Sequence, residues 1–89
     1  MFLVILTDTD MPSTDQEREL AGKVRRFIKA EAKRAGVGYK DLASRLAELG
    51  LAETEDSIAS KLARGTFSAI FMISVMGALG VETLRLDDL

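Results

Sequence analysis

The apolar residues of this chain recur at steps of three and four positions over most of its length, a spacing typical of α-helices. The longest run covers residues 15–35, and its apolar stripe consists of Leu20, Val24, Phe27, Ile28, Ala32 and Ala35. At about 100° per residue, Arg26, Lys29 and Lys33 fall on the opposite face. The pattern therefore predicts one long amphipathic helix, which Gly36 is well placed to end.

Two shorter amphipathic helices are predicted over residues 39–49 and 55–64. Thr54 is suited to cap the start of the second, while Gly50 and Gly65 follow the two helices as stop signals. The inward positions of the two helices are Leu42, Ala43, Leu46 and Leu49, then Ile58 and Leu62. The outward positions of the second are Ser57, Ser60 and Arg64. The second short helix is thus predicted to present a small, polar face to solvent.

A fourth predicted helix, residues 68–79, differs because it is apolar nearly all round. A helix of that composition is buried on more than one side. We expect part of it to face a second copy of the chain in a homodimer. The predicted dimer interface consists of Ile70, Phe71, Ile73 and Met76. The alternative is that the long first helix and the N-terminal segment cover this helix within one chain.

The two ends of the chain allow more than one arrangement. Residues 2–7, FLVILT, are apolar and partly β-branched, which predicts a short strand, followed by a linker that contains Pro12. Residues 81–89 are read either as a final short helix or as a strand that pairs with residues 2–7, within one chain or between two. We therefore divide the chain into a strand and linker, residues 1–13, and a mainly α domain of four to five helices, residues 14–89.

Composition removes several kinds of chemistry. The chain has 89 residues, enough for one domain, and contains no Cys and no His. The absence of Cys excludes disulfides and thiolate metal sites. The absence of His excludes the commonest general base and the commonest metal ligand. No convergent catalytic set remains, so we expect no enzyme activity, no metal and no cofactor. The initial apolar run, FLVIL, is shorter than the about 7–15 residues of a secretory signal or the about 20 of a membrane span, so we expect a cytoplasmic protein.

Charge is distributed unevenly along the chain. The net charge is −2, yet residues 18–45 carry nine Lys or Arg against three acidic residues, which gives +6, while residues 1–17 and 46–89 each carry −4. A central basic block suggests a phosphate-bearing partner, although a solvated helix face is the plainer interpretation.

The segments GYKDLASRLAELG and IASKLARG resemble the helix-turn-helix of lambda-repressor-like (Cro/repressor-type) domains, and IFMISVMGALGVETLRL resembles the next helix and tail of that family. The resemblance covers about residues 20–86, although the turn before the second helix is several residues longer here. More narrowly, the run from GVGYKDLA through TEDSIASKLARGTFSAIF resembles a family of small bacterial proteins described only as a domain of unknown function.

The broader resemblance implies a transcriptional regulator that binds double-stranded DNA as a homodimer. Residues 55–64 would enter the major groove, with residues 39–45 on phosphates. The implied DNA-binding residues are Tyr39, Lys40, Arg45, Ser57, Ser60, Lys61, Arg64 and Thr66. The alternative is a protein-interaction or dimerisation module that has the same fold and does not bind DNA. It is favoured by Glu53, Glu55 and Asp56, which crowd the start of the predicted recognition helix.

Overall fold

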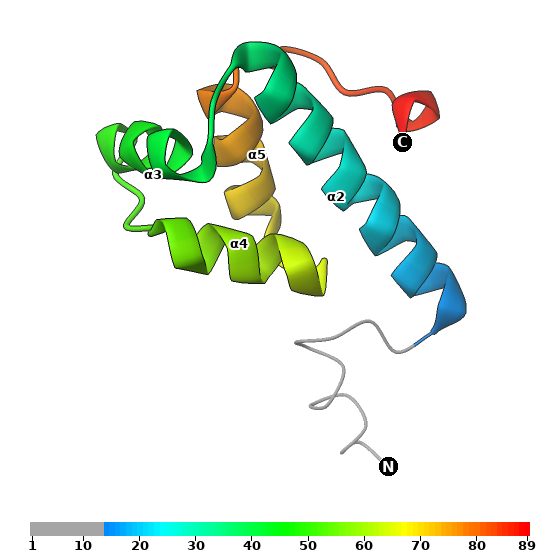
Figure 1. The fold of residues 1–89 in the computed structure, drawn as a ribbon. Coiled ribbons are helices and arrows are strands. Elements are labelled where there is room, and N and C mark those ends of the chain that lie inside the picture. Colours follow the sequence, from blue (N-terminus) through cyan, green and yellow to red (C-terminus); the bar gives the residue numbers. More distant parts are fainter. Residues whose placement is uncertain (1–13) are drawn as a thin grey trace.

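The computed structural model of the chain describes residues 14–89, and the predicted strand and linker at residues 1–13 lie outside this part. The described elements are α2 (Asp15–Ala35), α3 (Tyr39–Glu48), α4 (Glu55–Arg64), α5 (Ala69–Ala78) and a 3-10 turn, η1 (Leu86–Asp88). Figure 1 shows α2 along one side of the molecule, with α3, α4 and α5 gathered beside it. The prediction of a mainly α domain is confirmed, and each α-helix lies within a residue or two of its predicted bounds.

Reciprocal side-chain caps explain where two of the helices begin. Thr14 Oγ1 accepts from the backbone N–H of Glu17 at 3.0 Å, and Glu17 Oε1 accepts from the backbone N–H of Thr14 at 3.0 Å. Thr54 and Ser57 make the same reciprocal pair at the start of α4. Each pair satisfies two N–H groups that have no partner inside the helix, which fixes the first turn.

The core forms where α3, α4 and α5 meet the C-terminal half of α2. Its most deeply buried side chains, all less than 2% exposed, are Ile28, Leu42, Leu46, Ile58, Leu62 and Val75. Complete burial of one such side chain stabilises the fold by about 1.5–3 kcal/mol. These six residues come from all four α-helices, so the arrangement of α3 and α4 depends on contacts with both α2 and α5.

The N-terminal half of α2 packs differently from the prediction. Leu20 is 53% exposed, whereas Ala21 is buried, because α2 approaches the end of α4 very closely at this point. A Cβ atom placed on Gly65 would lie only 2.4 Å from the Cβ of Ala21. Small residues on both chain segments therefore bring the two helices together, and the larger Leu20 side chain is displaced toward solvent.

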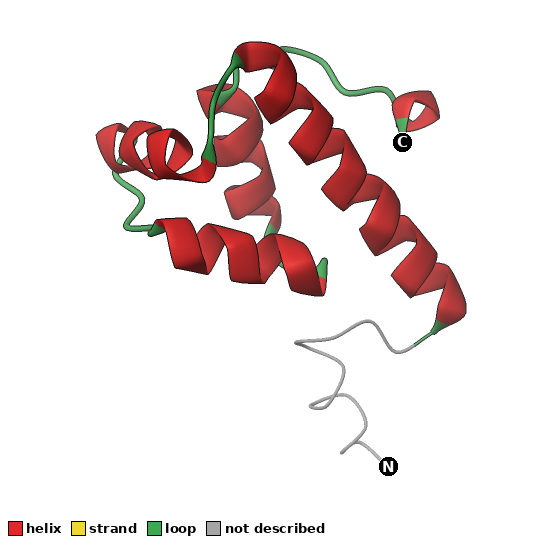
Figure 2. Cartoon of the chain, viewed as in Figure 1, coloured by secondary structure: helices red, strands yellow, loops and turns green. Residues whose placement is uncertain are grey.

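The C-terminal residues do not form the strand that the sequence allowed. Residues 14–89 contain no strand (Figure 2), and residues 86–88 form the 3-10 turn η1. Of the two alternatives for residues 81–89, the strand is therefore wrong, and with it the pairing of this segment with residues 2–7. In Figure 1 this segment crosses to the side of α2 that faces away from α5.

Candidate nucleic-acid interface

The outward face of α4 is built from small side chains. Ile58 and Leu62 are 0% and 1% exposed and anchor α4 to the core. The opposite side of the helix is exposed and carries Ala59, Ser60, Ala63 and Arg64, with Asp56 in its first turn. Arg64 Nη1 donates to Ser60 Oγ at 3.3 Å, one turn away. This arrangement allows another surface to approach the α4 backbone closely, with one guanidinium at the edge.

Two of the predicted DNA contacts on α4, Ser57 and Lys61, are engaged inside the chain. Ser57 Oγ donates to Glu53 Oε1 at 2.6 Å, and Lys61 Nζ forms a salt bridge with Glu53 Oε2 at 2.5 Å. The Lys61 ammonium also lies 4.8 Å from the centre of the Phe71 ring, a cation–π contact. Lys61 therefore connects the loop before α4 to α5, and both side chains are half-buried.

Glu53 is the centre of this network. Partial burial acts to raise the pKa of Glu53, but hydrogen bonds from Lys61 and Ser57, together with the Lys61 charge, outweigh it and hold the pKa below its ordinary value. Glu53 is thus an ionised anchor for the loop rather than a free acid that would repel a phosphate.

The start of α3 is open to solvent. Gly38 is its N-cap residue and supplies no side-chain hydrogen bond, so the N–H groups of the first turn have no side-chain cap. Lys40 is exposed beside them. Tyr39 is half-buried against the core; burial raises the pKa of its phenol, and the charge of Arg25 offsets part of that rise. Thr66 lies half-buried in the turn between α4 and α5.

Two arginines bind the ends of helices that lie far away in the sequence. Arg25 Nη1 donates to the carbonyl oxygens of Leu62 and Ala63 at 3.5 and 3.2 Å, at the end of α4. Arg45 Nη1 donates to the carbonyl oxygen of Ala78 at 2.8 Å, at the end of α5. A cation at the negative end of a helix is favourable. Arg45, a predicted phosphate contact, therefore already has a structural partner, and the importance of Arg25 was missed although it borders the apolar stripe of α2.

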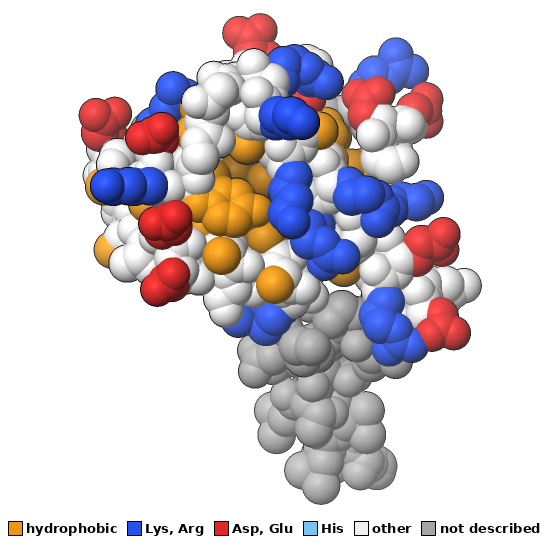
Figure 3. All heavy atoms as spheres, in the orientation of Figure 1, with side chains coloured by type: hydrophobic (Ala, Val, Ile, Leu, Met, Phe, Trp, Pro, Cys, Tyr) orange, Lys and Arg blue, Asp and Glu red, His pale blue; other side chains and the backbone are white. Residues whose placement is uncertain are grey.

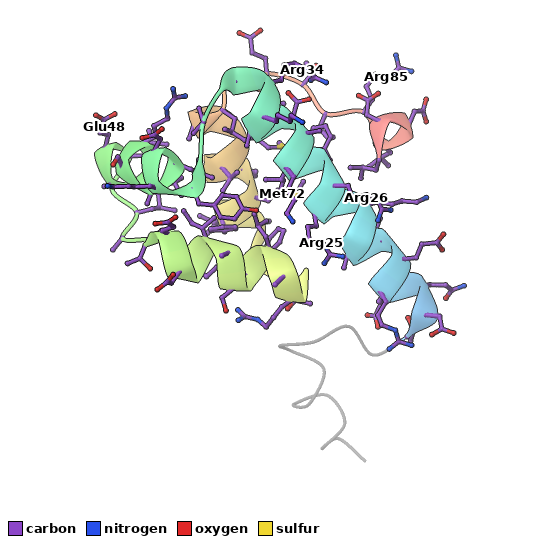
Figure 4. The ribbon with its side chains drawn as sticks, in the orientation of Figure 1. Arg25, Arg26, Arg34, Glu48, Met72 and Arg85 are labelled. Atoms are coloured by element: carbon purple, nitrogen blue, oxygen red, sulfur yellow. The ribbon has the colours of Figure 1, made fainter. Side chains whose placement is uncertain are left out.

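Most of the basic block lies away from the α4 face. Figure 4 shows Arg25 directed toward α4 and Arg26 directed to the other side of α2. Lys29 and Lys33 are exposed, as predicted. Figure 3 shows Lys and Arg side chains along α2, with Asp and Glu side chains over α3 and the start of α4. The outward face of α4 therefore has fewer positive charges near it than the basic block at residues 18–45 suggests.

The predicted dimer residues on α5 separate into two groups. Ile70 and Ile73 are 71% and 65% exposed. Phe71 is only 3% exposed and packs against Phe67, with ring centres 5.2 Å apart, and Met76 is half-buried. Phe71 is thus a core residue of its own chain, and only the two isoleucines project freely into solvent.

A family model described as "Domain of unknown function (DUF6471)" matches residues 20–84, which is most of the chain. The chain belongs to this family. The DUF6471 match includes all of α3, α4 and α5 and therefore the whole candidate surface, and it confirms the narrower resemblance seen in the sequence. A search of curated proteins and a search of solved structures each found no match.

Two further features of the DUF6471 domain concern metals and membranes. Residues 14–89 contain no group of three or more acidic side chains placed to hold a metal ion. None of the helices in the same part of the chain is both long and apolar enough to cross a membrane.

Proposed function

We propose that the chain is a lambda-repressor-like helix-turn-helix protein that binds double-stranded DNA, with α4 in the major groove. The observation that carries the proposal is the exposed α4 face, where Ala59, Ser60 and Ala63 are small and Arg64 stands at the edge. The major groove is about 12 Å wide and an α-helix with its side chains measures about 10–12 Å across. Small outward side chains would let the α4 backbone lie close to the base edges.

The contacts within the chain change which residues we assign to DNA. Ser60 and Arg64 are the best candidates for base or phosphate contacts from α4, since both are exposed polar groups. Ser57 and Lys61 are assigned instead to positioning α4 through Glu53. Arg64 is the side chain best suited to guanine, whose two major-groove acceptors fit a guanidinium.

The start of α3 would hold a neighbouring phosphate. Its first-turn N–H groups have no side-chain cap, and the positive end of a helix favours an anion. Lys40 lies in the same turn and brings a positive charge to it, next to the exposed carboxylate of Asp41. In a helix-turn-helix, the first helix typically contacts the backbone while the second reads the groove. Lys40 and Arg64 would therefore have separable roles, one in affinity for any duplex and one in preference for a sequence.

The test is a titration of fluorescent duplex DNA, selected from a random pool, at several salt concentrations. Lys40→Ala is expected to lower affinity for all sequences and to reduce the slope of log affinity against log salt by about 1. Arg64→Ala is expected to cost about 1–3 kcal/mol and to relax sequence preference.

Lys29→Ala is the matched control, because it removes the same charge from an exposed position on α2 instead of α3. It should leave sequence preference unchanged and reduce affinity less than Lys40→Ala does. If Lys29→Ala weakens binding more than Lys40→Ala and Arg64→Ala, DNA lies on α2 and the assignment to α4 is wrong.

A protein-interaction module without DNA binding is the second candidate. Its support is the exposed pair Glu55 and Asp56 in the first turn of α4, where acids oppose the approach of phosphate. This candidate predicts no binding to pooled duplex DNA even at low salt, where phosphate contacts are strongest.

A further inference from the structure

A groove of about 600 Å³ runs along α2, on the side that faces the C-terminal turn. Most of its lining residues come from α2 and recur at steps of three and four positions, so they share one side of the helix. These are Lys23, Arg26, Phe27, Ala30, Glu31 and Arg34, while Asp88 and Leu89 line the groove from the C-terminal segment. Sites for small molecules typically measure about 300–1,000 Å³. The groove is therefore large enough for a bicyclic aromatic compound.

One end of the groove is positively charged. Lys23 and Arg26 are both exposed, and neither forms a salt bridge with another residue of the described range 14–89. The Arg26 guanidinium lies back over the preceding turn, where its Nη1 is 3.3 Å from the position that a Cβ atom on Gly22 would occupy. Helical side chains lean toward the N-terminus in this way. The lean brings the guanidinium level with the turn that carries Lys23, so two cations lie close together.

The rest of α2 in the groove is apolar or balanced in charge. Phe27 and Leu89 are half-buried and supply apolar surface from opposite walls, and Ala30 adds a small exposed side chain. Glu31 and Arg34 form a salt bridge with each other, so each charge is already compensated. The groove therefore combines a cationic end with an apolar wall.

One acidic group opposes this positive charge. Asp88 is exposed on the wall that η1 forms, and no salt bridge within residues 14–89 compensates it. The side chains that line the groove nevertheless carry three positive and two negative charges, a net charge of +1, whereas the whole chain has −2. The groove should thus attract an anion more than the average surface of the chain does, and Asp88 reduces this attraction without reversing it.

We propose that this groove binds a small anion with a flat, apolar body, such as an aromatic carboxylate or an aryl phosphate. The anionic head lies between Lys23 and Arg26, which can both donate charge-assisted hydrogen bonds to it. The apolar body lies against Phe27, Ala30 and Leu89. Because the groove is open and has few polar groups, we expect a dissociation constant of about 0.1–1 mM. Arg26 points away from α4 in Figure 4, so this site does not depend on the proposed DNA binding.

The first test is a titration of the isotope-labelled full chain with 2-naphthoate, followed through backbone amide chemical shifts. We expect saturable shifts centred on residues 23–34 and 84–89. The neutral analogue 2-naphthamide has the same rings, and it should bind about fivefold more weakly because it lacks the charge. A parallel titration with 2-naphthyl phosphate shows which anionic head is preferred, and tighter binding than the amide by either head supports the site. Equal binding of all three compounds, or shifts centred on Ile70 and Ile73 of α5, would overturn the proposal.

Charge variants test where the head of the ligand lies. Arg26→Gln and Lys29→Gln each remove one exposed positive charge from α2, but only Arg26 lines the groove. Arg26→Gln is expected to weaken 2-naphthoate binding about threefold, and Lys29→Gln should leave it nearly unchanged. Asp88→Asn removes the opposing carboxylate and should strengthen binding about twofold. Equal losses from the two glutamine variants, or weaker binding by Asp88→Asn, would show that the groove does not select an anion.

Ala30→Phe tests the groove itself without a change of charge. Ala30 is exposed and lines the groove, so a phenyl ring at this position would occupy the volume that the ligand needs, and we expect about tenfold weaker binding. Ala35→Phe is the matched control, because Ala35 is also exposed on α2 but does not line the groove. Circular dichroism would confirm that both variants are folded. Unchanged binding by Ala30→Phe, or an equal loss in Ala35→Phe, would place the ligand elsewhere and overturn the proposal.

Discussion

The close contact between Gly65 and Ala21 gives a stability prediction with two separable parts. Gly65 has a φ of 75°, a left-handed conformation that costs other L-residues about 1–2 kcal/mol. A Cβ atom on Gly65 would also lie 2.4 Å from the Cβ of Ala21, so α2 and α4 would have to move apart, and overpacking of this kind costs about 1–3 kcal/mol. Gly65→Ala is therefore expected to lower the free energy of unfolding by about 2–5 kcal/mol.

Gly50 provides a control that isolates the backbone part. It has a φ of 89°, and no atom lies within 4 Å of its Cβ position. Gly50→Ala should therefore cost only the about 1–2 kcal/mol of left-handed strain. Ala21→Gly, introduced together with Gly65→Ala, should relieve the contact between the helices and recover part of the lost stability, less the about 0.5–1 kcal/mol that Gly costs inside a helix.

Urea denaturation followed by far-UV circular dichroism measures all of these differences. A loss of 1 kcal/mol corresponds to about 4–8 °C in Tm for a domain of this size, so a thermal scan gives an independent check. Equal costs for Gly65→Ala and Gly50→Ala would show that α2 and α4 do not touch at this point. The description of how α2 packs would then be wrong.

Three other predictions concern the core, the loop before α4 and the end of α5. Leu42→Ala, at a residue that is 0% exposed, is expected to destabilise the chain by about 2–5 kcal/mol in urea, and a smaller loss would mean that the core collapses around the cavity. Because folding lowers the pKa of Glu53, the contribution of this carboxylate to stability is full above the ordinary value of 4.5 and is lost as pH falls through the lowered pKa. Glu53→Gln should therefore remove part of the loss of stability at low pH. An unchanged loss of stability at low pH would count against the hydrogen-bond network around Glu53. Arg45→Met keeps most of the side-chain length but loses the bond to Ala78, so we expect a loss of about 1 kcal/mol in urea, whereas Arg85→Met, at an exposed pair, should cost almost nothing.

The sequence was most informative where one residue decides a local structure. Thr54 marked a helix start because its side chain bonds to a nearby N–H group, and Gly36 and Gly65 marked helix ends. The spacing of Ile58 and Leu62 predicted which side of α4 is buried, and Ser60 and Arg64 are exposed as expected. These features depend on residues within a few positions of one another, which a single sequence displays directly.

The remaining features depend on which segments meet in space. The engagement of Ser57 and Lys61 requires the loop to fold Glu53 back over α4, and no local pattern indicates that. Likewise, the apolar character of α5 predicted two buried sides but not that Phe71 faces inward while Ile73 faces outward. The large apolar side chain of Leu20 was predicted to be buried, but Leu20 is exposed and the smaller Ala21 packs in its place.

The bonds made by Arg25 and Arg45 bear on how long the folded chain persists. Arg25 binds carbonyl groups 37 and 38 positions away in the chain, and Arg45 binds one 33 positions away. Both bonds require helix ends that have already formed and docked, so we expect them to appear after the rate-limiting step of folding. Interactions formed that late slow unfolding and barely change the refolding rate, and slower refolding of Arg25→Met in stopped-flow experiments would contradict this order. Resistance to proteases that attack the opened chain would then depend on two guanidinium groups at the ends of two short helices.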